Sequence, residues 1–541
     1  MRLSKNIIFS QSTRRTQRKE SIKLVFSVNS VLSVRGIFFA FTQPQSYLFF
    51  NFLATLLFFL INLEGSELAK SKKEKMLVRN EIVKTVPVAI AQNKDKPLTL
   101  EKLIDGINKN FSLLLAAFQD IDIAESELLS AKGAFDGAIK ANGTTAPTGY
   151  YANNRMDMLI EQPTMYNGMS FFGGYRMGRG SFAPYDGKLA TNSLGEIRAG
   201  ARVPLWRDRS IDKNRAALKQ AEIGIQIADL SVSQQKIDII RNATLRYWDW
   251  IAAAQRYTIA KSLYDVALQR EKQIIKRVKA GDLPPIEQAD NERVLLQRES
   301  FLIGSEQNLE IAANELSIYL TDENGNARHP RIEEIPESAF SLFEEIRDTN
   351  LDKEIEMALE RRPELKRFKA QIDQNRIDQE LAKNQMGPGV DLVIIGSQDL
   401  GTGSVTRSKP EIEASIVLNV PLRTRTAQGK LDGASAKNEK LSKQERFFKD
   451  RITADIRNSF SNVNVTRQRA ILAQKEFVLA KKLEEAERVR YVMGEGTLLV
   501  VNIREQTTGE AAIREIDALV DHHRAIANYK AAVADILKVK N

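Results

Sequence analysis

Two stretches of this sequence are so long and so poor in helix breakers that they predict helices far longer than a globular domain. Each follows a Val-Pro-Leu motif, at 203–205 and again at 420–422, and each runs for about 70 residues before a glycine, Gly281 or Gly494. One helix over 205–280 would be about 110 Å long at 1.5 Å per residue. Because no single compact domain needs a helix of that length, we expect an elongated molecule.

Each long helix is predicted to turn at its glycine and to return as a shorter helix, at 285–320 and 497–539. Two more helical patterns of about half length lie at 98–135 and 351–386. The order of elements therefore repeats, in residues 97–330 and 331–541, as helix, β-hairpin, long helix and helix. We expect the half-length helices to stack end to end, 285–320 with 351–386 and 497–539 with 98–135, beside the two long ones.

The apolar residues of the long helices follow a narrow stripe. Ile223, Ile227, Leu230 and Ile237 recur in steps of three, four and seven, whereas most other positions are polar. This spacing is typical of coiled-coil packing and not of a thick core. A single chain of this kind buries little surface, so we expect several copies arranged around an axis.

Two β-like regions precede the long helices. Segments such as "MSFFGGYRMG" and "EIEASIVLNV" are about ten residues long and alternate weakly between apolar and polar residues. They fit either strands of a membrane barrel or a soluble β cap. Pro204 and Pro421 close the regions and mark the strand-to-helix junctions, because proline is tolerated at such ends. Four strands cannot close a barrel in lipid, so the membrane hypothesis requires several chains.

The net charge of +10 is concentrated at the N-terminus, where residues 1–80 hold 13 Lys and Arg against 4 Asp and Glu. The remainder is nearly neutral, which argues against a nucleic-acid partner. The uncharged apolar run at 47–63 predicts an export signal, with a retained anchor or translated non-coding sequence as alternatives. We therefore expect residues 1–96 to be a leader and linker, and the ordered protein to begin near Pro97. The absence of cysteine excludes disulfides, thiol catalysis and cysteine zinc sites.

From about residue 97 onward the chain resembles the TolC-type outer-membrane efflux protein family. The similarity lies in "LTLEKLIDGI", "RPELKRFKAQIDQNRIDQELAKNQ", the duplicated "VPL", "IIRNATLRYWDWIAAAQ", "RYVMGEG" and "ANYKAAVADIL", in that order and spacing. The resemblance implies an α+β membrane protein: a homotrimer with a long α-helical barrel of duplicated hairpins and a β-barrel to which each chain gives four strands. It further implies an exit duct in the cell outer membrane with a periplasmic tunnel, which passes small molecules or proteins outward together with a periplasmic adaptor and an inner-membrane transporter.

In the relatives, acidic residues stand six and nine positions after the second-repeat glycine and ring the pore. Here Val500 and Ile503 occupy those positions, whereas the first repeat has Glu287 and Asp290. The acidic pair could form a cation-favouring ring, or could be solvated acids in a first helical turn, which favours them. Val500 and Ile503 could form an apolar constriction or belong to ordinary coiled-coil core.

Gly281 and Gly494 are expected to be turn residues, and the resemblance places adaptor contacts at their tips. We expect no cofactor, no metal and no enzymatic activity, because no nucleophile elbow, phosphate loop or dinucleotide motif is present. His522 and His523 are adjacent on a helix, so they point apart and do not suit one metal. The alternative function is a periplasmic coiled-coil adaptor, which would carry one hairpin between compact β domains, or a soluble scaffold.

Overall fold

The computed structural model describes residues 97–322, 325–336 and 351–535. The chain divides into two compact units, Met1–Asn93 and Lys94–Asn541, and every element below belongs to the second. The predicted leader, with its apolar run at 47–63, lies outside the described residues.

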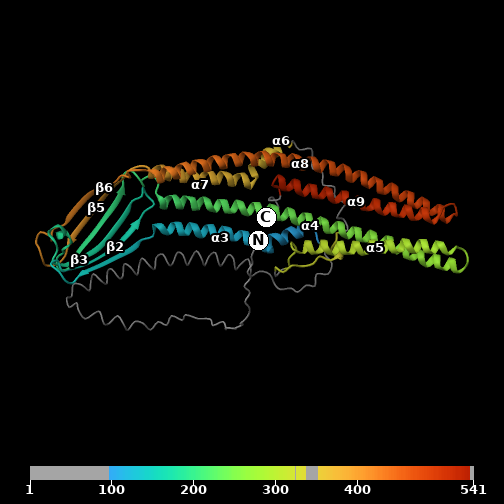
Figure 1. Ribbon diagram of the computed structural model, residues 1–541, viewed down its shortest axis with the longest axis horizontal. Coiled ribbons are helices and arrows are strands. Elements are labelled where there is room, and N and C mark those ends of the chain that lie inside the picture. The colour runs from blue at the N-terminus through green and yellow to red at the C-terminus, as the bar shows by residue number, and fades with distance from the viewer. Residues whose placement is uncertain (1–96, 323–324, 337–350, 536–541) are drawn as a thin grey trace, which may run out of the picture. The chain divides into compact units, whose positions relative to one another are not determined.

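Two helices of nearly equal length run through this unit (Figure 1). They are α4 (Lys213–Lys279, 67 residues) and α8 (Arg425–Val492, 68 residues), each about 100 Å long at the standard rise. Each turns at its end and returns as a shorter helix, α5 (Pro285–Ser317) or α9 (Leu498–Ala532). The two predicted hairpins are therefore confirmed.

The first long helix begins later than its predicted start at residue 205. The Asp212 carboxylate accepts hydrogen bonds from the backbone nitrogens of Asn214 and Arg215 at 2.8 and 3.0 Å. This N-cap stabilises a helix start at Lys213 and leaves 205–212 as an irregular connection.

The predicted half-length helices are each divided in two. Residues 98–135 form α2 (Leu100–Asn110) and α3 (Ser112–Lys132), separated at Phe111, whose backbone is extended. Residues 351–386 form α6 (Leu351–Arg361) and α7 (Pro363–Gln385). Pro363 explains the second division, because proline has no backbone N–H and is suited to a first helical turn.

The expected stacking of these helices is wrong. In the structure α3 and α5 both pack against α4, whereas α7 and α9 both pack between α4 and α8. A helix between two others must bury two sides, and α9 does so with 15 buried residues out of 35. Helix α5 buries only 6 of 33, which suits a position on the flank.

The largest core lies about half-way along the long helices, where several elements converge. Leu103 and Ile107 of α2, Trp250 of α4, Leu316 of α5 and Val520 of α9 belong to one buried cluster. Trp250 is completely buried. This cluster fixes the ends of the shorter helices against α4.

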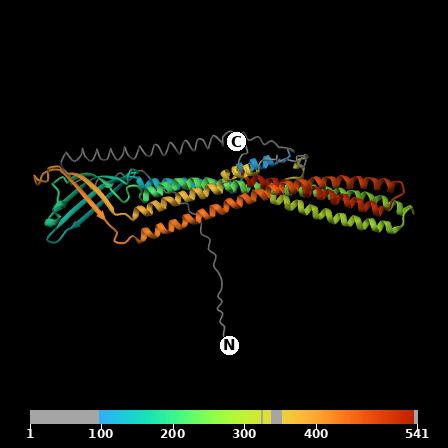
Figure 2. The ribbon, with the colours of Figure 1, turned by 90° about the horizontal axis from the view of Figure 1, so that it is seen from above.

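One antiparallel sheet occupies the end of the unit opposite the two hairpin turns, with its strands inclined to the long helices (Figure 2). Its six strands follow sequence order: β1 (Ala138–Ala146), β2 (Asn153–Pro163), β3 (Ser170–Gly180), β4 (Glu196–Pro204), β5 (Gly389–Asp399) and β6 (Glu411–Asn419). The first and last strands, β1 and β6, are the edges of the sheet. No helix in the described part of the chain combines the length and apolar character needed to cross a membrane.

The expected count of four strands per chain is wrong, because the chain has six. The first β-region forms four strands where a single hairpin was expected, and the second forms the remaining two. Strands β1 and β2 pair over their full length, from Ala138 opposite Glu161 to Ala146 opposite Asn153. Their charged side chains interrupt the apolar pattern, so the sequence alone gives these strands a weak signal. The register of pairing then places all of these charges on one face of the sheet.

Candidate functional site

The two faces of the six-stranded sheet differ in chemistry. Residues directly opposite one another in neighbouring strands share a face, so the register assigns every side chain. One face, called here the apolar face, is rich in apolar side chains along all six strands, including Ile139, Met156, Met158, Ile160, Phe171, Tyr175, Ile197, Val203, Leu392, Ile394, Ile412, Ile416 and Leu418. The opposite face, called here the charged face, includes Lys140, Arg155, Asp157, Glu161, Arg176, Glu196, Arg198, Arg202, Asp391, Asp399, Glu411 and Glu413.

Ion pairs connect the strands across the charged face. Arg176 Nε donates to the Glu196 carboxylate at 2.7 Å, between β3 and β4. Arg198 donates to Asp157 Oδ1 at 2.7 Å, and Arg202 Nε donates to Asp391 Oδ2 at 3.2 Å. These ion pairs orient the charged side chains across the sheet, on a face that carries more acidic than basic residues.

Contacts across the charged face indicate that it is the concave side of the sheet. Arg198 lies on β4 and Asp157 on β2, so their ion pair reaches across β3. Gly174 of β3 stands opposite both Arg198 and Leu159, and it has no side chain to block the contact. Side chains two strands apart meet in this way on the inside of a curved sheet.

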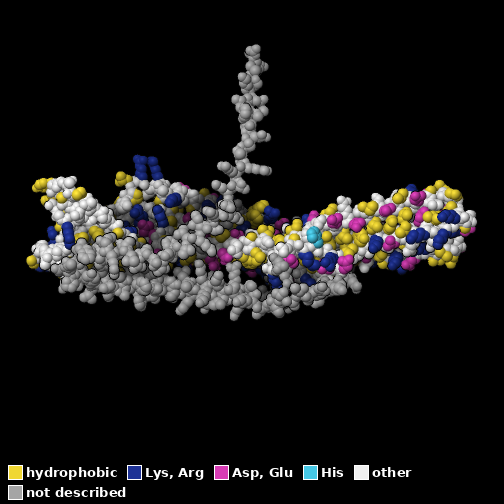
Figure 3. Space-filling model, turned by 90° about the horizontal axis from the view of Figure 1, so that it is seen from below, with side chains coloured by type: hydrophobic (Ala, Val, Ile, Leu, Met, Phe, Trp, Pro, Cys, Tyr) yellow, Lys and Arg dark blue, Asp and Glu magenta, His cyan; other side chains and the backbone are white. Residues whose placement is uncertain are grey.

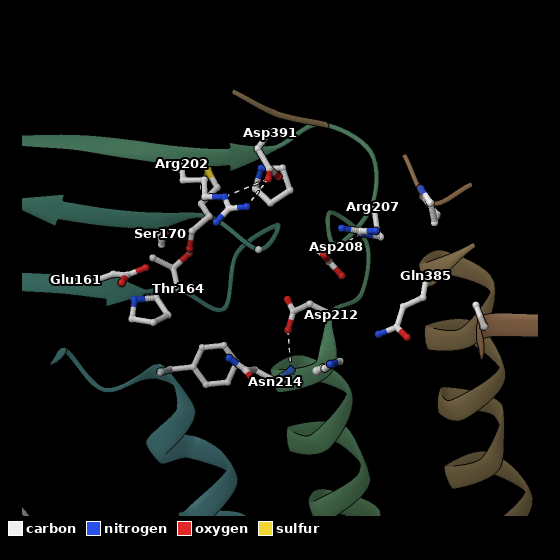
Figure 4. Close-up of a pocket in the computed structure, with 18 of the residues that line it drawn as sticks. Glu161, Thr164, Ser170, Arg202, Arg207, Asp208, Asp212, Asn214, Gln385 and Asp391 are labelled. Atoms are coloured by element: carbon white, nitrogen blue, oxygen red, sulfur yellow. Dashed lines mark hydrogen bonds and ion pairs between the residues drawn. The ribbon is translucent and has the colours of Figure 1, made fainter. Parts of the chain in front are cut away.

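An open polar cavity of about 700 Å³ lies where the sheet meets the helices (Figure 4). Both sequence-predicted junction residues, Pro204 at the end of β4 and Pro421 after β6, line it. The Arg202–Asp391 ion pair closes one side, and Asp212, the N-cap of α4, faces it from the other (Figure 4). The cavity thus continues the charged face toward the helices.

Asp208 in the connection between β4 and α4 has positive φ (68°), which non-glycine residues adopt rarely. Arg215 donates to its backbone oxygen at 2.5 Å and so holds the connection on the first turn of α4. Burial raises the pKa of the Asp208 carboxyl, Arg207 lowers it, and the charges of Asp212 and Asp391 raise it further, so that the net shift is upward. The junction therefore carries a concentration of carboxylates in a confined space.

The two hairpin tips at the opposite end have the same backbone geometry. Gly281 and Gly494 both have φ of +82°, and a Cβ at either position would meet nothing within 4 Å. Beyond each glycine, a backbone nitrogen donates to the carbonyl five residues earlier, from Asp282 to Arg277 and from Glu495 to Arg490, both at 2.9 Å. This is the Schellman helix ending, in which the left-handed backbone selects glycine.

The four predicted pore residues are divided between the two hairpins. Glu287 is half-buried in the first turn of α5, and Asp290 is exposed one turn later. In α9, Val500 is half-buried and Ile503 is 51% exposed. Ile503 is therefore not core within one chain.

A buried charge cluster behind the tips was not predicted. Glu505 of α9 is only 1% exposed, and its carboxylate accepts from Arg298 of α5 at 2.9 Å and from Arg488 of α8 at 3.0 Å. Arg270 of α4 donates to the same carboxylate at 3.1 Å. One side chain thus joins all four helices of the two hairpins.

The available sequence signal was the position of Glu505 in its helix. Leu498, Val501 and Glu505 follow the three- and four-residue steps of the buried seam of α9, so a carboxylate there has to meet cations. Burial acts to raise the pKa of Glu505, but the hydrogen bonds and charges of Arg270 and Arg298 outweigh it and hold the pKa below its ordinary value. Glu505 is consequently an anion at neutral pH.

The two adjacent histidines of α9 are separated by the structure. His522 is buried, with Nδ1 3.3 Å from the Thr466 hydroxyl. The His523 ring stacks on Trp248 with centroids 3.8 Å apart. Within the described ranges, no group of three or more His, Asp or Glu side chains is arranged to hold a metal ion.

Comparison with known proteins places this architecture among outer-membrane channels. No family model and no curated protein sequence matches the chain. The solved structure of the Campylobacter jejuni outer membrane channel CmeC matches at a TM-score of 0.58, with 15% identity over 82% of this chain and 90% of that one. The open state of the Neisseria gonorrhoeae outer membrane channel MtrE matches at 0.57, with 14% identity over 83% and 96%. The outer membrane protein VceC of Vibrio cholerae matches at 0.55, with 14% identity over 80% and 95%.

These neighbours are channels and not enzymes, and they are all of the TolC type. The chain therefore has the fold of the TolC-type outer-membrane efflux channels. The resemblance found in the sequence is confirmed for the fold.

Proposed function

We propose that this protein is the outer-membrane exit duct of a multi-component efflux or type I secretion system, and that it works as a homotrimer. The two-faced sheet carries the proposal. A curved sheet with an apolar outer side and a charged inner side is what a barrel wall between lipid and water requires. A soluble β cap would have the reverse arrangement, with its apolar side packed inward.

The free edges of the sheet support assembly from several chains. Strands β1 and β6 are the edges within one chain, and unpaired edges are not tolerated in lipid. We propose that β6 of one copy pairs with β1 of the next. A trimer would then close a barrel of eighteen strands, three times the six in one chain, where the family resemblance implies twelve.

Six strands also match the width of the helical part. Strands about 4.8 Å apart and tilted by about 40° give six strands roughly 38 Å of circumference. The helices occupy four positions side by side: α4, α8, and the pairs α3 with α5 and α7 with α9. Four helices about 9–10 Å apart also span roughly 38 Å. Four strands would span only about 25 Å and would require the duct to narrow at the membrane.

The flanking helices carry apolar seams that one chain leaves uncovered. On α5 the residues buried at seven-residue steps are Asn291, Arg298, Ser305 and Ala312. The apolar residues Leu296, Ile303 and Ile311 of α5, and Ile318 directly after it, are exposed. On the opposite flank, Val465, Leu472 and Leu479 of α8 are exposed at heptad spacing. Apolar side chains gather along the helices at the end away from the sheet (Figure 3). We propose that the α8 seam of one copy packs on the α5 seam of the next.

Replacing Leu472 by Lys should dissociate the trimer. A loss of about 2 kcal/mol at each of three interfaces corresponds to roughly 10⁴-fold in the trimer dissociation constant. Gln474→Lys is the matched control, because Gln474 is an exposed polar residue two positions further along the same helix. Analytical ultracentrifugation in detergent would measure both variants, and a trimer that is equally stable in Leu472→Lys would contradict the proposed seam.

The hairpin tips are proposed to be the closable periplasmic entrance and the contact for an adaptor protein, with an inner-membrane transporter beyond it. The alternative function, a periplasmic adaptor or scaffold, fits less well. An adaptor has one hairpin between compact β domains, whereas this chain has two hairpins and an open sheet with a continuous apolar face. The duct is therefore the better-supported function.

Single-channel conductance of the purified protein in a planar bilayer tests the duct and its entrance together. If three copies of Glu287 and Asp290 ring the entrance, the channel should favour cations. Replacing both residues by Ala should then reduce the cation-to-anion permeability ratio by about threefold or more. Val500→Ser with Ile503→Ser is the comparison for an apolar constriction, which should instead raise conductance. Absence of any channel from well-folded protein would contradict the proposed function.

A further inference from the structure

The segment between β3 and β4, residues 181–195, is long enough to extend away from the sheet but instead folds back onto it. It contains a short helix, η4 (Pro184–Leu189), and it leads from the outer end of β3 to the outer end of β4. This is the end of the sheet farthest from the helices (Figure 1). Its position on one particular face of the sheet decides what it can do.

Contacts from this segment reach the charged face at β3 and at β6. Arg176 of β3 donates to the backbone oxygen of Lys188 at 3.0 Å. The Lys188 ammonium lies 3.4 Å from Glu413 and 3.9 Å from Glu411, both on β6. Since β6 is three strands away from β3 in the sheet order, Lys188 spans the concave face.

Gly178 of β3 shows how closely the segment approaches the sheet. A Cβ at this position would lie 1.8 Å from the backbone oxygen of Leu189, so only glycine leaves room for the segment. Gly178 stands opposite Arg155 in the register and therefore belongs to the charged face. The fold-back is thus built into the strand itself.

A second loop fixes the outer end of the segment. Asn192 is 2% exposed, and its backbone nitrogen donates to the Asp399 carboxylate of β5 at 2.9 Å. Its side chain donates to the Ser408 hydroxyl at 3.1 Å and accepts from the backbone nitrogen of Ser404 at 3.0 Å. These bonds tie residues 181–195 to the loop between β5 and β6.

We propose that residues 181–195 form a constriction inside the outer mouth of the channel and that Lys188 determines its ion preference. The inference rests on the proposed function, because the charged face lines the channel only if the sheet closes into a barrel. Three copies of the segment, one from each chain, reduce the opening of a barrel that would otherwise be about as wide as the helical tunnel. Lys188 lies against two acidic side chains there, so its loss makes the mouth more negative.

Cysteine modification in planar bilayers tests the constriction, and the absence of native cysteine makes the labelling specific. In the Lys188→Cys variant, a bulky methanethiosulfonate reagent should lower the single-channel conductance in three steps, to about half of its starting value. Before modification, the variant should be more cation-selective than wild type. Lys409→Cys is the matched control, because Lys409 is an exposed lysine of the neighbouring outer loop, and its modification should change conductance by much less.

A shortened variant gives an independent measurement, in which residues 183–190 are replaced by two glycines and conductance should rise about twofold. Unchanged conductance after complete modification of Lys188→Cys, verified by mass spectrometry, would overturn the constriction while leaving the duct intact. A wild-type protein that forms no conducting channel would overturn the proposed function, and the constriction with it.

Discussion

Replacing Ile394 by Lys should prevent insertion of the protein into membranes, whereas the same substitution at Ile395 should not. The two residues are neighbours in the middle of β5, but Ile394 pairs with Ala201 and Ala414 on the apolar face. Ile395 pairs with Gly200 and Glu413 on the charged face. A lysine at the lipid-facing midplane costs about 2–4 kcal/mol, and a trimer would incur this cost three times. A lysine beside Glu413 instead gains an acidic neighbour.

Fractionation of outer membranes and reconstitution into liposomes would measure the effect. Ile394→Lys should reduce the inserted fraction by at least tenfold, and Ile395→Lys should stay close to wild type. Equal insertion of the two variants would show that the apolar face does not contact lipid. The sheet would then be a soluble β cap. Because the pair shares strand, residue type and substitution, a general loss of strand propensity cannot explain a difference between them.

The helical half of the fold could be predicted from sequence because its signals are local. Long runs without breakers and two glycines gave α4, α8 and both hairpin turns. The helix stacking could not be derived in the same way, because it depends on which helix buries two sides. The many apolar residues of α9 are consistent with burial on two sides. Which helices cover those sides, however, cannot be determined from the sequence of α9 alone.

The sheet was under-predicted because its order is set by pairing and not by local pattern. In β1 and β2 the charged residues weaken the alternation, and their positions make sense only after the register aligns Asp157 with Arg176 and brings Arg198 toward it. The fold-back of 181–195 could not be predicted either. The requirement for glycine at 178 is understood only when the backbone of Leu189 is known to lie against it. The proposed roles of Glu287, Asp290, Val500 and Ile503 stay predictions.

Glu505→Gln should loosen the distal halves of both hairpins. Within one chain, this carboxylate is the shared acceptor for Arg270, Arg298 and Arg488. Removing its charge leaves the buried guanidinium groups of Arg270 and Arg298 without their acidic partner, whereas Arg488 keeps Glu484 at 2.8 Å. Breaking a buried ion pair in this way typically costs about 3–5 kcal/mol. Glu510→Gln is the control, because Glu510 is exposed five residues later in α9 and its nearest cation, Arg514, is 3.9 Å away. An exposed pair of that kind contributes about 0–1 kcal/mol.

Hydrogen–deuterium exchange read by mass spectrometry would localise the effect of Glu505→Gln. Amides in 270–300 and 485–510 should exchange roughly 100- to 1,000-fold faster at neutral pH, whereas the core around Trp250 should be unchanged. The same cluster predicts the acid response of the wild type. Since the folded-state pKa of Glu505 lies below its ordinary value of 4.5, its stabilisation is complete at neutral pH and is lost as the pH falls below about 4.5 through the folded pKa. Glu505→Gln should lack this part of the acid response, and an identical acid profile in both proteins would show that the cluster does not hold the hairpins together.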